Sequence, residues 1–153
     1  MFIIVGKATP NRQTGDIELY LREFRQMLQH QGQFVYAWSF NPDARAIFTI
    51  QQHLDNNEDV FLYLPFDGQH SNLRMHIINF VHNHNGIDRC PVAWTPCCVG
   101  GLQGQQDWGV HIWFLINAID DLQEPIDLLA TFTPAFSDKY HVWGRNFFAF
   151  LQG

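Results

Sequence analysis

The residues best suited to do chemistry in this chain are Trp38 and its neighbour Ser39. Residues 34–41 alternate aromatic side chains with small or polar ones, and Asn41-Pro42 ends the run, which is typical of a half-buried strand. A tryptophan at a strand exit is held rigidly by a sheet and can still be reached from solvent. We therefore interpret Trp38 as one wall of a slot for a planar group, with Ser39 at its edge. The alternative is that Trp38 only anchors the core, as large aromatic residues often do.

Histidines and thiols supply rival chemistry. Those that lie close together in sequence are His82, His84, Cys90, Cys97 and Cys98. Imidazole and thiolate groups can bind zinc, but the usual Cys-x-x-Cys spacing is missing, so we expect no metal site and no cofactor. A cysteine hydrolase is a second alternative, because a thiol and a histidine need only meet in space. A protein-interaction module is a third, and we expect a binding protein that is not an enzyme.

Composition restricts the partners of the chain. Its 153 residues, 46% of them hydrophobic, favour a single domain over residues 1–153. The net charge of −6 argues against a protein that coats nucleic acid by charge alone, because phosphate neutralisation needs clustered Lys and Arg. A pocket reader with few basic contacts is compatible with this charge. The odd number of cysteines, 3, and the lack of a signal-peptide or membrane-spanning pattern predict a cytoplasmic location.

The first half of the chain predicts strand, helix, strand and helix in that order. The β-branched and aromatic run at residues 2–5 predicts a central strand. Residues 16–31 place apolar side chains on one helical face, and Gly32 is the expected C-cap. After the Trp38 strand, residues 41–43 read Asn-Pro-Asp, which is a start signal for a second, shorter helix.

The second half of the chain is dominated by strands. They are predicted at residues 60–64, 73–81, 108–119 and 146–151. Between them we expect an irregular segment at residues 82–107, departure from the sheet at Glu124-Pro125, and a loop at residues 130–144. The predicted fold class is α/β (α+β), with a curled or barrel-like mixed sheet and two or three helices packed outside.

The order and spacing of these elements and motifs resemble the EVE and YTH-like branch of the PUA superfamily over nearly the whole chain. The motifs that carry the resemblance are Trp38-Ser39, Trp94 in the irregular segment, residues 122–126 and Gly144-Arg145-Asn146. The resemblance implies a PUA-like domain that binds a modified nucleobase in an aromatic cage. Some members lie at the N-terminus of modification-dependent restriction proteins of the McrBC type, and the domain itself is not catalytic.

The resemblance also assigns roles to single residues. It makes Trp38 the first wall of the cage and Trp94 the second, and Leu102 and Trp108 compete for the third. The polar residues that it places around the base are Ser39, Thr9 and Asn11. Arg145 matches a contact to the nucleic-acid backbone, and Lys7 and Arg12 are further candidates for such contacts.

The implied partner is nucleic acid that carries a modified base. Duplex DNA with a methylated adenine or cytosine is favoured, and modified RNA is the alternative. Each base–aromatic stack contributes roughly 1–3 kcal/mol, against an extrusion cost of a few kcal/mol. The walls alone therefore break even, so a methyl group between the rings and hydrogen bonds to the base edge would decide selectivity. Any cleavage would belong to a fused or associated motor or nuclease.

Overall fold

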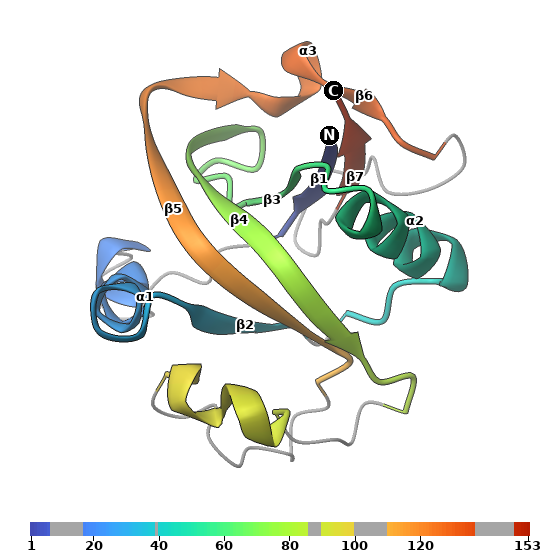
Figure 1. Ribbon diagram of the computed structural model, residues 1–153. Coiled ribbons are helices and arrows are strands. Elements are labelled where there is room, and N and C mark those ends of the chain that lie inside the picture. The colour runs from blue at the N-terminus through green and yellow to red at the C-terminus, as the bar shows by residue number, and fades with distance from the viewer. Residues whose placement is uncertain (7–16, 39, 86–89, 100–109, 137–148) are drawn as a thin grey trace.

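The computed structural model describes residues 1–6, 17–38, 40–85, 90–99, 110–136 and 149–153. The strands are β1 (Phe2–Val5), β2 (Phe34–Trp38), β3 (Val60–Tyr63), β4 (His70–His82), β5 (Ile112–Asp127), β6 (Thr133–Pro134) and β7 (Ala149–Gln152). The helices are α1 (Ile17–Gln31), α2 (Ala44–Asp55), the 3-10 helix η1 (Val92–Cys97) and α3 (Leu128–Thr131). All seven strands form one open mixed sheet in the order β2-β5-β4-β3-β1-β7-β6 (Figure 1).

β1 lies inside the sheet because its residues are apolar on both faces, and all four are buried. It pairs in parallel with β3 and antiparallel with β7, so strands from the two ends of the chain lie side by side (Figure 1). The predicted central strand is confirmed. The adjacent β6 is an edge strand and was not predicted; it lies inside residues 130–144, and α3 overlaps that range only at residues 130 and 131.

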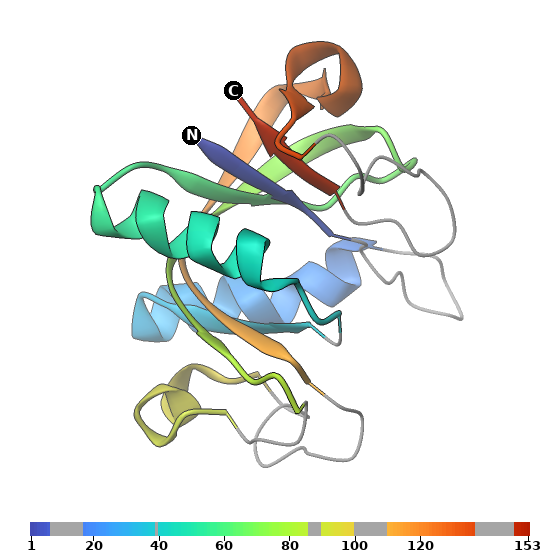
Figure 2. The ribbon, with the colours of Figure 1, turned by 90° about the vertical axis from the view of Figure 1, so that its right-hand side faces the viewer.

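β4 and β5 form a long antiparallel ribbon that bends across the molecule (Figures 1 and 2). Between the pairs Leu73–Asp121 and Ser71–Ile126, β5 holds residues 122–125 where β4 holds Asn72 alone. A bulge of this kind bends a strand without ending it, and it tolerates a proline because its backbone is unpaired. The predicted departure from the sheet at Glu124-Pro125 is therefore wrong, since β5 continues to Asp127.

α1 ends and α2 begins at the predicted signals. Gly32 follows α1 with a φ of +74°, and its amide donates to the Leu28 carbonyl, as in a left-handed C-cap. Asp43 caps α2 by accepting from the Ala46 amide at 2.9 Å. β2 ends at Trp38, three residues before the predicted end at Asn41. The segment predicted to be irregular contains η1, which the sequence pattern did not indicate.

Three clusters of buried side chains pack against the sheet. The main core packs one face of the central strands against α1 and α2, and includes Phe24, Phe34, Ile50, Met75 and Phe114. A second cluster lies on the other face of β1, β3 and β7. The third cluster, the cysteine cluster, consists of Val35, Cys90, Cys97, Cys98, Val110, Trp113 and Leu115. Figures 1 and 2 both show α2 above β2 and η1 below it, so η1 covers the side of β2 away from α2.

Candidate functional site

Trp38 is the last residue of β2, and the sheet holds it from its neighbour β5. Trp38 pairs with Ile112, and its carbonyl accepts from the His111 amide at 3.0 Å. The indole ring is half-buried against the main core and lies 5.2 Å from the Phe40 ring and 6.1 Å from the Phe114 ring, centroid to centroid. The backbone of Trp38 is therefore fixed, while part of its ring remains accessible.

A row of aromatic rings runs from Trp38 to the opposite part of the sheet. Phe40 lies 6.4 Å from Phe150 of β7, and Phe150 lies 5.8 Å from Phe2 and 5.9 Å from Phe136. We call Trp38, Phe40, Phe150, Phe2 and Phe136 the aromatic row. Sequence reasoning named Trp38 alone, although Phe40 follows it on the same alternating pattern. The row connects the exit of β2 to β1 and β7.

Most of the predicted site residues lie outside the described residues. They are Lys7, Thr9, Asn11, Arg12, Ser39, Leu102, Trp108 and Arg145. At least one described residue beside each of these segments can be placed relative to the aromatic row.

The flanking residues meet through pairing and packing. Gly6 follows Val5, which pairs with Ala149, and Ala149 precedes Phe150 of the aromatic row. Phe136 belongs to the row itself, and Val99 packs against the main core, as Trp38 does. His111, which follows the segment ending at residue 109 by two positions, donates its amide to Trp38. The chain thus enters or leaves each of the four segments with site predictions close to the aromatic row.

Trp94 lies on a different side of β2. It is half-buried in η1 and packs against the cysteine cluster, as Ala37 of β2 also does. Successive residues of a strand point to opposite faces, so Ala37 and Trp38 belong to the two faces of β2. The two predicted walls therefore pack against different clusters. A slot that used both rings would have to form around the end of β2, where the strand no longer separates them.

The three cysteines form part of a buried cluster rather than an exposed ligand set. The Cys90 and Cys98 sulfurs are 2.7 Å apart, and burial raises the pKa of both thiols. Thiolates, which are the nucleophilic and metal-binding form, are therefore disfavoured. His82, from the rival zinc hypothesis, is hydrogen-bonded to Asn41 through Nε2. Within the part of the chain that the structure describes, no three His, Cys, Asp or Glu side chains gather as a metal site would require.

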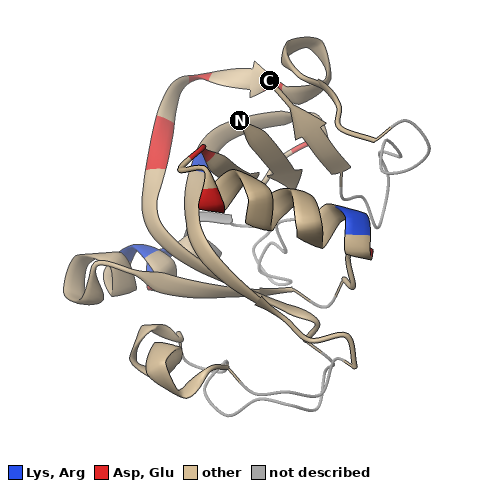
Figure 3. Cartoon of the chain, turned by 45° about the vertical axis from the view of Figure 1, so that its right-hand side comes forward, with Lys and Arg blue, Asp and Glu red and all other residues tan. Residues whose placement is uncertain are grey.

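Three of the arginines that the structure describes are paired with acids. Arg25 makes a two-pronged ion pair with Asp121 at 2.8 and 3.0 Å, and Arg45 lies 3.5 Å from Asp43. Arg74 donates to Asp120 at 2.8 Å. Figure 3 shows the acidic stretch along the bend of β5. Within the described residues, these pairs leave few positive charges for phosphate, in line with the acidic composition.

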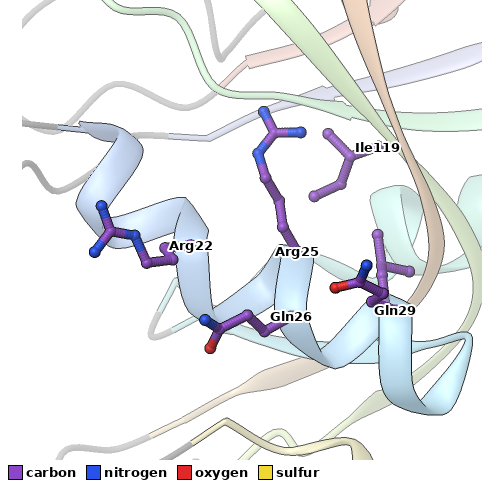
Figure 4. Close-up of a pocket in the computed structure, with 6 residues that line it drawn as sticks. Arg22, Arg25, Gln26, Gln29 and Ile119 are labelled. Atoms are coloured by element: carbon purple, nitrogen blue, oxygen red, sulfur yellow. The ribbon is translucent and has the colours of Figure 1, made fainter.

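Arg22 is the exception among the described Lys and Arg side chains, since no described carboxylate lies within ion-pair distance of it. It lines an open pocket of about 510 Å³ between α1 and β5, together with Arg25, Gln26, Leu28, Gln29 and Ile119. Figure 4 shows Arg25 reaching toward Ile119 and Arg22 pointing away from it. Sequence reasoning missed this pocket, because it depends on which acids fold against α1.

No family model, curated protein or solved structure matches this chain significantly. No helix within the described ranges is long and apolar enough to cross a membrane. Function must therefore be argued from the site itself, and the resemblance to the EVE and YTH-like branch remains a hypothesis.

Proposed function

We propose that this chain is a nucleic-acid reader that takes a modified base at the exit of β2, with Trp38 as the first stacking wall. The observation that carries the proposal is the position of Trp38, which is fixed by the sheet, partly accessible, and at one end of the aromatic row. A flipped base needs such a fixed ring, because stacking must repay the interactions that the base loses on leaving the helix. An indole that was free to rotate would lose conformational entropy when a base stacked on it, and this loss would weaken binding.

The convergence of the flanking residues supports the same site. In the proposed reader, Ser39, Trp94, Leu102 and Trp108 complete the cage around Trp38. Thr9 and Asn11 read the base edge, and Lys7, Arg12 and Arg145 contact the backbone. At least one described end of each segment that contains Lys7, Thr9, Asn11, Arg12, Ser39, Leu102, Trp108 or Arg145 lies near the aromatic row, as a shared site requires. The finer fold assignment, a PUA-like curled sheet of the EVE and YTH-like kind, is part of this proposal.

Charge guides the choice of substrate. With a net charge of −6 and most described arginines neutralised by acids, the reader makes few phosphate contacts and depends on the base pocket for affinity. We propose methylated adenine or cytosine in duplex DNA as the substrate class, with modified RNA as the alternative. The chain recognises and does not cut, and in a restriction system cleavage would come from an associated motor or nuclease.

A binding screen tests the proposal. Otherwise identical duplexes and single strands, each with one methylated adenine, one methylated cytosine or no modification, are titrated with the protein at several salt concentrations. We expect one modified probe to bind at least tenfold more tightly than its unmodified twin. The logarithm of the binding constant should fall with the logarithm of salt with a shallow slope, since the slope counts phosphate contacts. Equal affinity for all probes would reject the reader function.

A further inference from the structure

A second cavity lies beside the exit of β2 and has no role in the proposed reader. It has a volume of about 760 Å³ and lies between the start of α2 and the end of β4. We call it the histidine cavity; its lining includes Asn41, Ile47, Phe48, Phe80, His82 and His84. Its size lies within the range of small-molecule sites, which are mostly apolar with a few placed polar groups. Trp38 does not line it.

Phe48 gives the cavity an unusual wall. Its side chain is 67% exposed, although it sits on a helix whose Ala46 and Ile50 are fully buried. Phe80 and Ile47 supply half-buried apolar surface in the same cavity. An exposed aromatic ring beside further apolar surface can stack a flat ring, and such stacking is tolerant of the identity of the base.

The polar groups of the cavity are held in one orientation. The Asn41 side-chain oxygen faces His82 Nε2 at 2.7 Å, while its amide nitrogen faces the His84 carbonyl at 3.5 Å. The opposite amide orientation would set two oxygens against each other. His82 Nε2 must therefore donate to Asn41, which leaves His82 Nδ1 as an acceptor when the ring is neutral. Burial, and then His84 and His111, lower the pKa of His82 and so favour that neutral ring.

Charge excludes a phosphate as the occupant. The described lining contains no Lys or Arg, and Asp43 adds a carboxylate at the start of α2, where it already caps the Ala46 amide. An anion would meet this carboxylate, whose partner Arg45 at 3.5 Å lies outside the lining, and the described lining offers the anion no Lys or Arg. A neutral ring that offers an acceptor to the Asn41 amide and a donor to His82 would satisfy both fixed groups. Nucleobases combine these features with a flat apolar face.

We propose that the histidine cavity is a second binding site, for an uncharged planar heteroaromatic ring of the nucleobase type. The site stands on its own residues and does not depend on the proposed reader function. The ring can belong to a free nucleoside or to an unmodified nucleotide of a bound strand, and both sources present the same chemistry to Asn41, His82 and Phe48.

A titration followed by amide NMR tests the site and separates the two sources. One arm uses adenosine, cytidine, guanosine and uridine, and the other uses short unmodified single strands. We expect saturable shifts centred on Asn41, Phe48 and His82 in at least one arm. Shifts with nucleosides identify a free ligand as sufficient, and shifts with strands alone assign the ring to a strand. Adenosine monophosphate should bind no more tightly than adenosine.

The matched variants are Phe48→Ser and Phe66→Ser, because Phe66 is also exposed, at 52%, and lies outside the cavity. We expect Phe48→Ser to weaken binding about tenfold, as loss of one stacking contact does, and Phe66→Ser to leave it unchanged. Trp38→Ala should also leave it unchanged, which separates this site from the reader site. The proposal is overturned if neither arm shifts these amides, or if the two phenylalanine variants behave alike.

Discussion

Tryptophans lie on both faces of the sheet at β2, and their surroundings differ between the two faces. On one face, Trp38 lies at the strand end, half-buried beside the aromatic row and joined to the main core. On the other face, Trp94 packs from η1 onto the cysteine cluster and Trp113 lies fully buried within it. The comparison teaches that the position of a tryptophan on a strand, and the residues packed around it, decide whether a ligand can reach its ring. A polar sequence around the tryptophan is a weaker guide. Trp38 combines a fixed backbone with an accessible ring, whereas Trp94 also serves as a cover for buried thiols.

The largest expected effect is on the Trp94 side, at Trp113. Its side chain is 0% exposed, so Trp113→Ala should leave a large cavity and lower the free energy of unfolding by about 3–5 kcal/mol. Urea denaturation followed by circular dichroism measures this. A loss below about 1 kcal/mol would mean that the cysteine cluster is not a packed core, and would remove the contrast between the faces.

Trp94→Ala should expose the thiols that Trp94 covers. Because burial raises the pKa of Cys90 and Cys98, the native protein should react slowly with an aromatic disulfide reagent at pH 8. We expect Trp94→Ala to speed this reaction by about tenfold, the effect of about 1.4 kcal/mol easier opening. The matched variant Trp38→Ala lies on the other face and should leave the rate unchanged. Equal acceleration by both would show that the faces are not independent.

Loss of a contact to the nucleic-acid backbone should have a different effect on binding from loss of a contact to the base. Arg145→Ala should weaken modified and unmodified probes about equally and reduce the salt slope by about 1, since a phosphate contact positions without specifying. Arg22→Ala tests whether the pocket on α1 adds a second such contact. The measurement is fluorescence anisotropy across a salt series. Selective loss of the modified probe in Arg145→Ala would instead assign Arg145 to the base pocket.

The smallest effect is expected in a region that belongs to neither face. Hydrogen bonds from His76 at 2.6 Å and from Arg74 lower the pKa of Asp120. A carboxylate with a lowered folded-state pKa stabilises the fold above its unfolded pKa of about 3.9, and this contribution is lost as pH falls through the folded value. Asp120→Asn should therefore cost less than about 1 kcal/mol at pH 7, because the pair is partly exposed, and should flatten the acid limb of stability. Urea titrations from pH 7 to pH 2 measure this, and a steeper acid limb in the variant would contradict the sign.

Local signals explain which parts of the fold could be predicted. Gly32 and Asp43 set the helix boundaries through their own backbone and side-chain hydrogen bonds, so the sequence was enough there. The alternation of Tyr36 and Trp38 likewise predicted β2, although the strand ends at Trp38 and not at the predicted Asn41. Pro125 was misread because a bulge opposite Asn72, formed with a distant strand, keeps it in the sheet. β6 depends on pairing with β7, which no local pattern reports.

The candidate site likewise has one part that the sequence predicts and another that depends on tertiary packing. Trp38 could be recognised from its strand, but the side of β2 that Trp94 covers depends on where three cysteines pack, and sequence spacing does not contain that information. The aromatic row was missed for the same reason, since Phe40, Phe136 and Phe150 come together only through tertiary packing.

The most direct test of the central claim compares the parent protein with Trp38→Ala on a duplex with one methylated base and on its unmodified twin. Thermal unfolding of the variant is measured on the same sample, so that a loss of fold is not mistaken for a loss of recognition. If Trp38 is the first stacking wall, the variant stays folded and loses roughly 1–3 kcal/mol of affinity for the modified duplex, with little change for the unmodified one. A folded Trp38→Ala protein that keeps the full preference of the parent for the modified duplex would contradict the account.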